Sequence, residues 1–366
     1  MTSETNDGET VDRRAPLTLL TGFLGSGKTT MLNHILSSPD SGKTAVIVNE
    51  FGEIGIDGDL ITRADDEMME LTNGCICCAM KDDLLTTLLR LVQRRGGIIE
   101  PKIEFDRVLV ETTGIADPTP LAQLFYTDMT LSLTYRLDAV LTMIDLKHFN
   151  KMVETTDEAR KQIAFADKLI LNKRDLVSDG EYEAGIRVLD DLNPLAPREV
   201  AEYGRISVDR LLDIDLFEPK LRDDVVPDWI GVEEAHERGD GHNHDHHGHQ
   251  DDRTHSDIVS VSIVEERPLH WEPFVAFLQG LVDTYGDDLF RVKAIVQIDA
   301  VELPVIIQGV QAVFSPPTHS DVWPGGKRQT RLVVIGRRLD KAQILAAFET
   351  SLDRPAATFD PRWGAV

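Results

Sequence analysis

One short segment near the N-terminus constrains this chain more than any other feature of its sequence. Gly22-Phe-Leu-Gly-Ser-Gly-Lys-Thr29 fits the pattern G-x-x-x-x-G-K-[ST], and it stands between an apolar run, Leu17–Thr21, and a helical pattern, Thr29–Ser37. A strand, a glycine-rich turn and a helix in this order predict a phosphate-binding loop, because backbone N–H groups at the helix N-terminus converge on phosphate oxygens. The strand, the spacing and the Lys-Thr ending disfavour the alternative, a tight glycine turn without a ligand.

The residues of this loop have separate expected roles. We expect Lys28 to reach the β and γ phosphates of a nucleotide, and the Thr29 hydroxyl to bind Mg²⁺. The predicted nucleotide-binding residues of this segment are Gly22, Gly25, Ser26, Gly27, Lys28, Thr29 and Thr30.

Short β-like runs alternate with helical patterns from Leu17 to about Val200. The runs are Leu17–Thr21, Thr44–Asn49, Phe105–Val110, Ala139–Ile144 and Lys168–Leu171, and the helical patterns include Thr29–Ser37, Asp82–Arg94, Pro118–Tyr126 and Asp157–Phe165. Alternation of this kind implies crossover connections between strands. We therefore predict an α/β fold, a P-loop NTPase domain with a mostly parallel sheet and helices on both faces.

A second, smaller α+β domain is expected towards the C-terminus. Strands are predicted at Ile258–Val264, Phe290–Ile298, Val305–Ile307 and Arg331–Gly336, and helices at Glu272–Asp283 and Lys341–Leu352. The preceding stretch is dense in His, Asp, Glu and Gly and has little to bury, which predicts a flexible linker. The expected organisation is a disordered tail (1–15), the nucleotide-binding domain (16–227), the linker (228–257), the small domain (258–352) and a second tail (353–366).

Charge and apolar content argue against several classes of function. The formal net charge of −25 disfavours nucleic-acid binding, because contact with phosphates needs a cationic surface. No apolar stretch is long enough to span a membrane, and the first 14 residues are polar and lack the apolar core of a secretory signal. We expect a cytoplasmic protein that binds neither nucleic acid nor membrane.

A further apolar run ends in a carboxylate. Val108-Leu-Val-Glu-Thr-Thr-Gly114 is a strand-like segment followed by an acidic residue and a glycine. A carboxylate at the carboxyl end of a central strand lies beside bound phosphates, so Glu111 is a candidate to hold the magnesium hydration shell or to orient the attacking water. Gly114 would let a backbone N–H meet the γ-phosphate. An acidic residue at the end of a strand is commonly only solvated, but the phosphate loop favours a functional role for Glu111. Lys28, Thr29 and Glu111 are thus the predicted catalytic residues.

A later strand ends in a pattern that would select the base. Asn172-Lys-Arg-Asp175 follows the apolar run Lys168–Leu171. Asp175 can accept hydrogen bonds from guanine N1–H and the 2-amino group, whereas adenine offers neither donor, and a buried carboxylate left unpaired is costly. Asn172 and Lys173 would orient the base. A surface turn of this composition recurs by chance, but its position at a strand end favours a guanine pocket.

The three cysteines of the chain are Cys75, Cys77 and Cys78. An odd, clustered set predicts metal or redox chemistry rather than a disulfide framework. Thiolates at this spacing can converge on Zn²⁺ and leave one coordination position open, which suits transfer of the ion. Small buried hydrophobes and a redox pair are the alternatives; the neighbouring nucleotide motifs favour metal.

The loop before the cysteines is glycine-rich and acidic. It covers Asn49–Gly58 and stands where P-loop proteins carry a nucleotide-sensing switch. Glu50 or Glu53 is a candidate for the open position on the metal, as is a water or a side chain of a partner.

A histidine-rich tract lies in the predicted linker. Its members are His242, His244, His246, His247 and His249. Neutral imidazoles suit Zn, Cu, Ni and Co, so the tract could collect metal and deliver it to the cysteines. A solvated acidic linker that happens to contain histidine is an equal alternative, because a disordered tract loses entropy when it binds.

Taken in order, these motifs resemble those of the CobW-like metal-chaperone GTPases. The resemblance is carried by the phosphate loop, Asn49-Glu-Phe-Gly52, Asn73-Gly-Cys-Ile-Cys-Cys78, Glu111-Thr-Thr-Gly-Ile-Ala-Asp-Pro118 and Asn172-Lys-Arg-Asp175. In the C-terminal part, Glu266-Arg-Pro268, Trp323 and Arg331-Leu-Val-Val-Ile-Gly-Arg337 resemble the C-terminal domain of that family. The resemblance covers about Pro16 to Leu352.

This resemblance implies a GTPase whose CxCC motif, Cys75, Cys77 and Cys78, binds zinc or a related ion and hands it to a client. We predict a GTP-hydrolysing metallochaperone with slow intrinsic turnover. It would use GTP, Mg²⁺ and Zn²⁺ or Co²⁺, with a client metalloprotein as partner and a homodimer as a candidate assembly. The alternatives are cobalt handling in cobalamin biosynthesis, a passive zinc buffer gated by nucleotide, and an ATP-dependent kinase, which Asp175 disfavours.

Overall fold

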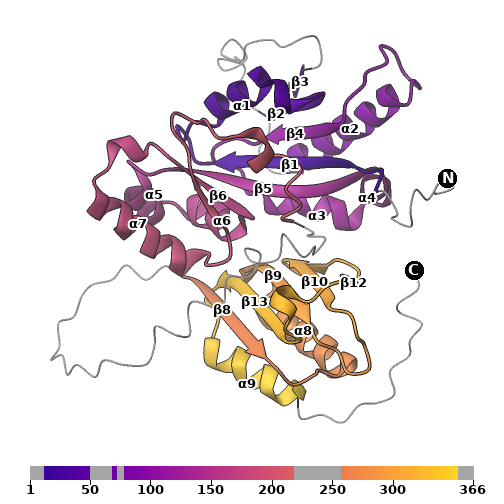
Figure 1. The fold of residues 1–366 in the computed structure, drawn as a ribbon, viewed down its shortest axis with the longest axis vertical. Helices are drawn as coiled ribbons and strands as arrows, with labels where there is room; N and C mark the ends of the chain where they lie inside the picture. The colour runs from indigo at the N-terminus through magenta and orange to yellow at the C-terminus, as the bar shows by residue number, and fades with distance from the viewer. Residues whose placement is uncertain (1–11, 50–67, 72–77, 218–256, 353–366) are drawn as a thin grey trace.

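The computed structural model describes residues 12–49, 68–71, 78–217 and 257–352 (Figure 1). The predicted tails and linker lie largely outside these residues, so their structure stays a prediction. In the described part of the chain, no helix is both long and apolar enough to cross a membrane.

The first sheet has seven strands among the described residues, in the order β3-β2-β4-β1-β5-β6-β7. Each described pair of neighbours in it is parallel, as predicted. The strands are β1 (Ala15–Gly22), β2 (Thr44–Asn49), β3 (Met68–Leu71), β4 (Arg107–Glu111), β5 (Tyr135–Asp145), β6 (Lys168–Asn172) and β7 (Arg198–Val200). Because the strands are parallel, their carboxyl ends meet at one edge of the sheet, where ligands bind in folds of this kind.

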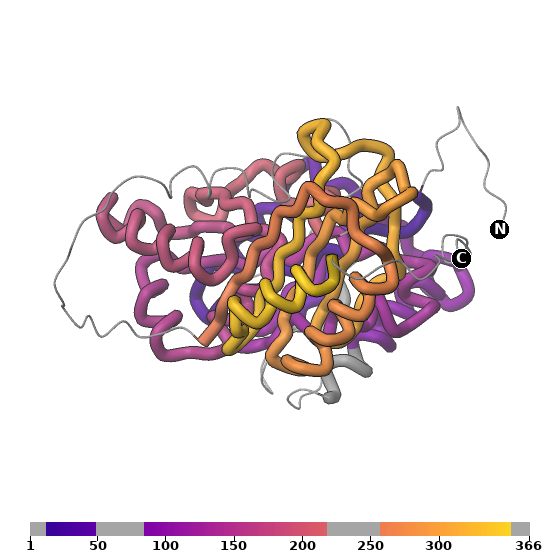
Figure 2. Tube along the Cα trace, turned by 90° about the horizontal axis from the view of Figure 1, so that it is seen from below, coloured from indigo at the N-terminus to yellow at the C-terminus, as the bar shows by residue number. Residues whose placement is uncertain are grey.

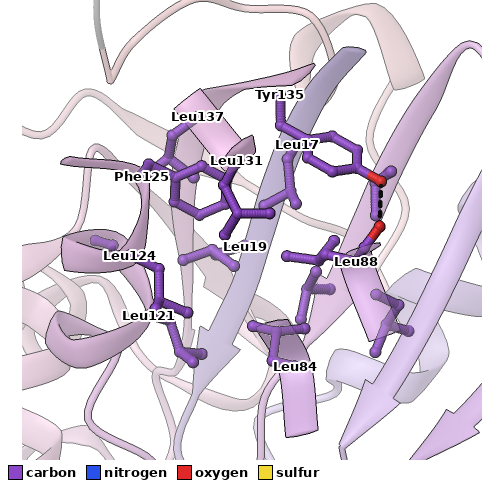
Figure 3. Close-up of a cluster of buried hydrophobic side chains, with 14 of the residues drawn as sticks. Leu17, Leu19, Leu84, Leu88, Leu121, Leu124, Phe125, Leu131, Tyr135 and Leu137 are labelled. Atoms are coloured by element: carbon purple, nitrogen blue, oxygen red, sulfur yellow. Dashed lines mark hydrogen bonds between the residues drawn. The ribbon is translucent and has the colours of Figure 1, made fainter. Parts of the chain in front are cut away.

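Helices cover both faces of this sheet. Successive residues of a strand point to opposite faces, and the apolar residues of β1 on each face are buried by helices. Leu17 and Leu19 of β1 pack against α2, α3 and α4, whereas Leu20 packs against α1. Figure 3 shows the first of these cores, in which the Tyr135 hydroxyl donates to the Leu88 carbonyl oxygen at 2.9 Å. The helices are α1 (Lys28–Ser37), α2 (Cys78–Arg95), α3 (Thr119–Thr127), α4 (Met129–Thr134), α5 (Phe149–Thr155), α6 (Asp157–Phe165) and α7 (Asp179–Leu192).

The second sheet is antiparallel and confirms the predicted α+β architecture of the C-terminal part. Its strands follow the order β11-β10-β9-β13-β8, and β12 pairs with β10. One face of the sheet is covered by α8 and α9, which lie nearer the viewer in Figure 2. The elements are β8 (Ile258–Glu265), α8 (Trp271–Tyr285), β9 (Leu289–Val296), β10 (Val305–Val310), β11 (Val313–Phe314), β12 (Thr318–His319), β13 (Thr330–Arg337) and α9 (Lys341–Leu352).

The other face of the second sheet packs on the helices below the first sheet. Figure 1 shows β8, β9 and β10 beneath α7, α6 and α3, and these pairs of elements are in contact. One apolar core is shared across this boundary: Ile163 and Leu189 belong to it from the first part, and Ile295 and Val333 from the second. The two sheets are therefore joined by a buried interface as well as by the chain.

Candidate guanine-nucleotide site

The phosphate loop connects β1 to α1 at the carboxyl edge of the first sheet. Gly22 has a φ of 139°, and a Cβ there would lie 2.4 Å from the carbonyl oxygen of Met143 on β5. Gly27 has a φ of 106°, and a Cβ there would lie 2.6 Å from Asn172 Nδ2. The backbone conformation and the closeness of neighbouring strands both require glycine at these two motif positions.

Lys28 begins α1, and its ammonium group lies inside the loop. The side chain is buried, and Nζ donates to the carbonyl oxygens of Gly22 at 2.9 Å and Phe23 at 3.3 Å. Ser26 Oγ is also buried and has no hydrogen-bond partner among the described residues. A cation at a helix N-terminus, beside a buried hydroxyl, suits a phosphate group because all of these groups attract anionic oxygens.

Glu111 ends β4 and lies beside the start of α1. Its Cα is level with Leu20 of β1, and Thr29 Oγ1 donates to Glu111 Oε1 at 3.4 Å. The Glu111 side chain is buried. A hydroxyl and a carboxylate oxygen are the hard donors that Mg²⁺ prefers. The two side chains therefore fit a magnesium ion held next to the phosphates.

The loop after β4 lies against the phosphate loop. A Cβ on Gly114 would lie 2.6 Å from the backbone nitrogen of Leu24, so a larger residue would push the two loops apart. The Gly114 carbonyl oxygen accepts a hydrogen bond from Gln162 Nε2 at 3.2 Å. The sequence predicts Gly114 as a residue whose backbone N–H meets the γ-phosphate, and the structure adds this close approach as a reason for glycine.

Asn172 joins the predicted base pocket to the phosphate loop. Its Nδ2 donates to the Ser26 carbonyl oxygen at 2.9 Å, and its Oδ1 accepts from the Gly204 N–H at 3.1 Å. Asp175, in the short helix Arg174–Leu176, is exposed at the carboxyl edge of the sheet. The described structure thus brings the two predicted motifs together, with Asp175 open to a ligand.

Lys173 is held by a carboxylate that sequence analysis did not identify. It has a left-handed φ of 61°, and its Nζ donates to the Gly25 carbonyl oxygen at 2.7 Å and to Asp145 Oδ2 at 2.8 Å. Burial by itself would raise the pKa of Asp145, but hydrogen bonds from Lys173 and His148 outweigh burial and hold that pKa below its usual value. An ionised Asp145 therefore holds the Lys173 ammonium group beside the phosphate loop.

Asp145, Gln162 and Gly204 were missed because no local motif marks them. Asp145 does end a predicted strand, as Glu111 does, and this position was the available signal. Gln162 lies in a helix, and Gly204 lies in a turn after β7. Their contacts with the motifs exist only in the folded chain.

The predicted metal ligands lie almost entirely outside the described residues. These are Glu50, Glu53, Cys75, Cys77 and the histidines from His242 to His249. Cys78 is the first residue of α2, and its side chain is not described. Within the described ranges, no three His, Cys, Asp or Glu side chains form a metal-binding group. The metal predictions therefore stay untested by the geometry.

Comparison with protein families gives two matches along the chain. A family model described as "CobW/HypB/UreG, nucleotide-binding domain" matches residues 16–198. A second, described as "Cobalamin synthesis protein cobW C-terminal domain", matches residues 258–352.

Individual relatives cover nearly the whole chain. The zinc chaperone YjiA of Escherichia coli (strain K12) is 33% identical over 332 residues, which are 91% of this chain and 97% of the relative. The zinc-regulated GTPase metalloprotein activator 1 of Saccharomyces cerevisiae is 27% identical and covers 93% of this chain and 84% of its own length. The crystal structure of Zn(II)-bound YjiA GTPase from E. coli superposes with a TM-score of 0.68 at 28% identity, over 92% of this chain and 99% of that one.

Proposed function

This chain belongs to the CobW/HypB/UreG family of P-loop GTPases, and we propose that it couples GTP hydrolysis to the transfer of zinc to a client metalloprotein. The support comes from relatives that are named zinc chaperones and that match over 91% of this chain. Cys75, Cys77 and Cys78 are the proposed ligands of the cargo ion.

Hydrolysis of GTP is assigned to the phosphate end of the site. Lys28 would hold the β and γ phosphates, and Thr29 would bind Mg²⁺, which when present neutralises charge that develops on the phosphates. Glu111 would hold the hydration shell of the ion or orient the attacking water. The contact between Thr29 and Glu111 supports both roles, because it puts a hydroxyl and a carboxylate beside the loop.

Selection of guanine is assigned to the other end of the site. Asp175 would accept the N1–H and 2-amino hydrogens of the base, and the stem of Lys173 would lie along the ring. Asp145 supports this assignment, because it holds Lys173 at 2.8 Å. Asn172 would then attach the segment that carries Lys173 and Asp175 to the phosphate loop through its bond to the Ser26 carbonyl oxygen.

The observation that carries the metal part of the proposal is the position of β3. This strand is parallel to β2, and β2 is parallel to β4 with Val48 level with Glu111. Leu71, the last residue of β3, therefore lies at the same edge of the sheet where Glu111 ends β4, and the cysteine motif follows Leu71 in the sequence. Helix α2 begins at Cys78. This arrangement supports a cargo site close enough to the nucleotide for one to influence the other.

Zinc is the proposed cargo because the relatives carry that ion in their names. Cobalt is the second candidate, since thiolate and imidazole ligands bind several ions of this series and selectivity depends on geometry. We place the transfer in the cytoplasm. A passive zinc buffer is the competing function. A buffer would bind zinc equally well, but its rate of zinc release would not depend on GTP hydrolysis.

The test is the zinc content of the full chain purified without an affinity tag, measured by mass spectrometry after equilibration with a weak chelator. We expect one tightly held zinc per chain. The Cys77→Ser variant should lose it, and deletion of Gly241–His249 should keep it. Transfer to an apo-acceptor should be faster during GTP hydrolysis than with GDP. Tight zinc in the Cys77→Ser variant, or equal transfer with both nucleotides, would contradict the proposal.

A further inference from the structure

Helix α6 holds the loop that follows β4. Gln162, which is 1% exposed, donates from Nε2 to the carbonyl oxygens of Gly114 at 3.2 Å and Ala116 at 2.9 Å. One turn of the loop is thus fixed by a single buried amide. Lys161, the preceding residue of the helix, lies 3.8 Å from the Asp117 carboxylate on the same loop.

This loop has little freedom to move without affecting the phosphate loop. Gly114 is packed so closely on Leu24 that even a Cβ would lie 2.6 Å from its backbone nitrogen. Glu111 precedes Gly114 by three residues and contacts Thr29. A displacement of the Gly114 carbonyl would therefore move the loop after β4, together with Glu111, relative to Leu24 and Thr29 at the phosphate loop.

The position of Gln162 is itself fixed from the first sheet. The Thr142 hydroxyl on β5 donates to the Gln162 backbone carbonyl oxygen at 3.0 Å, and both residues are buried. The amide can therefore hold the loop only while α6 keeps its place against β5.

Both ends of α6 are held by the C-terminal part of the chain. At its start, Arg337 Nη2 lies 2.9 Å from Asp157 Oδ2. At its end, the Arg291 guanidinium lies 5.1 Å from the centre of the Phe165 ring and 3.1 Å from the carboxylate of Asp167. The helix also contacts β9, which lies beneath it in Figure 1. α6 thus stands between the second sheet and the loop after β4.

We propose that Gln162 is a positioning residue for GTP hydrolysis, which holds the Gly114 loop against the phosphate loop, and that α6 makes this hold depend on the packing of the C-terminal domain. Gln162 touches neither phosphate nor magnesium in this account; it acts through the loop. The inference rests on the proposed assignment of the γ-phosphate to the Gly114 loop. Nucleotide binding in the GDP state should hardly involve Gln162, since GDP lacks the γ-phosphate.

The first test is Gln162→Met, which keeps the length of the side chain and removes the donor. In a single-turnover assay with enzyme in excess over GTP, hydrolysis should slow by about tenfold to a hundredfold, because small misplacements of reacting groups have effects of that size. The affinity for GDP should change less than twofold. Glu158→Gln, on the exposed face of the same helix, is the matched control and should leave both quantities unchanged. Lys28→Ala reports separately on the phosphate site.

The outcomes of this first test separate the inference from the proposed function. If Lys28→Ala still hydrolyses GTP, the assignment of the phosphate site fails. If Lys28→Ala is inactive and Gln162→Met hydrolyses GTP at the wild-type rate, the positioning role is wrong. Equal losses of GDP affinity and hydrolysis in Gln162→Met would make the residue structural and would also overturn the role.

The second test is a double-mutant cycle with Arg291→Met. This variant should fold, because Lys293 still pairs with Asp167 at 2.5 Å, and two buried nitrogens of Arg291 have no hydrogen-bond partner among the described residues. Arg291→Met should slow single-turnover hydrolysis severalfold in the wild-type background and have no further effect in the Gln162→Met background. Equal effects in both backgrounds, or no effect in either, would exclude the link through α6. If Arg291→Met does not fold, Arg337→Met, which removes the pairing with Asp157 at the start of α6, offers the same cycle.

Discussion

At the scale of residues, the account depends on side chains that connect the two ends of the nucleotide site. Asn172 bonds to the phosphate loop through its nitrogen and to the turn after β7 through its oxygen. Lys173 bonds to the phosphate loop and to Asp145. Because these contacts leave Asp175 exposed at the edge of the sheet, its carboxylate is the group available to read the base.

Asp175→Asn should change the base that the site accepts. The asparagine amide presents a donor where guanine also has donors, so the affinity for GTP should fall by at least about tenfold. Xanthosine triphosphate has a second carbonyl at this position and should bind to the variant better than to the wild type. Competition with a fluorescent guanine nucleotide measures both affinities. Asp191→Asn, exposed on α7, should bind GTP as the wild type does. Equal affinities of the wild type for ATP and GTP would remove the base pocket from the account.

Sequence reasoning reached the motif residues more easily than their partners. Gly22, Gly27 and Lys28 are neighbours in the chain, so their spacing alone predicts a phosphate loop. Gln162 meets Gly114 across 48 residues, and Asp145 meets Lys173 across 28. No pattern within a short window contains such pairs; they follow from the order of strands in the folded sheet.

At the scale of elements, β5 carries a buried carboxylate that holds the segment leading out of the nucleotide-binding part. Asp138 is fully buried; its Oδ2 accepts from Thr18 Oγ1 at 2.8 Å, and its Oδ1 accepts from the Asp215 N–H at 2.7 Å. Arg136 lies 3.8 Å away and pairs also with Asp213 and Asp215. Burial raises the pKa of Asp138 to about 7, and the hydrogen bond from Thr18 and the charge of Arg136 limit the rise.

This carboxylate gives stability a defined dependence on pH. The folded chain keeps the Asp138 proton up to about pH 7, whereas the unfolded chain loses it near pH 4. The folded state therefore loses stability as pH rises from about 4 to about 7. Asp138→Asn cannot ionise, so its stability relative to the wild type should grow by on the order of 2–3 kcal/mol between pH 5 and pH 8. Urea unfolding at both pH values measures this difference; a difference independent of pH would refute the burial argument.

Elements with a wide apolar stripe were predictable, and short or narrow ones were not. β1, β4 and β6 are apolar runs buried in the sheet, and their predicted bounds lie close to those of the structure. β3 and β7 have four and three residues and exist because a neighbouring strand pairs with them. α7 was not predicted, although Ser178 and Glu181 form a capping box at its start; Gly185, Leu189 and Leu192 are its buried residues.

At the scale of the whole molecule, the two sheets share a hydrophobic core and a buried group of charges. Arg291 and Lys293, both on β9, share the Asp167 oxygen Oδ1, and Asp167 Oδ2 accepts from the Val140 N–H. Arg291 is also stacked 4.1 Å from the ring centre of Phe217. The partners of Asp167 are more than 120 residues away in sequence, so this joint could not be predicted from the sequence.

Substitutions of the charged residues at this joint should reduce the stability of the folded state by unequal amounts. Asp167→Asn leaves two buried cations without their shared carboxylate and should cost about 3–5 kcal/mol of stability. Burial lowers the pKa of Lys293 to about 8, so its charge is already disfavoured. Lys293→Met leaves a matched pair of Arg291 and Asp167, and should therefore cost about 1 kcal/mol or less. Thermal unfolding of both variants at pH 7 shows which one loses more stability. A larger loss of stability in Lys293→Met than in Asp167→Asn would contradict this charge balance.

The central claim is that one molecule couples a GTPase site to a metal site at the same edge of a sheet. A γ-phosphate can order a neighbouring loop that is released on hydrolysis, and coupling between two binding sites is reciprocal. The most direct test is a competition titration of zinc against a chromophoric chelator at fixed pH, with the full chain bound either to GDP or to a non-hydrolysable GTP analogue. The account predicts zinc affinities that differ by about 5–150-fold, and loss of this difference in Cys77→Ser. Identical zinc affinities in the two nucleotide states would contradict it.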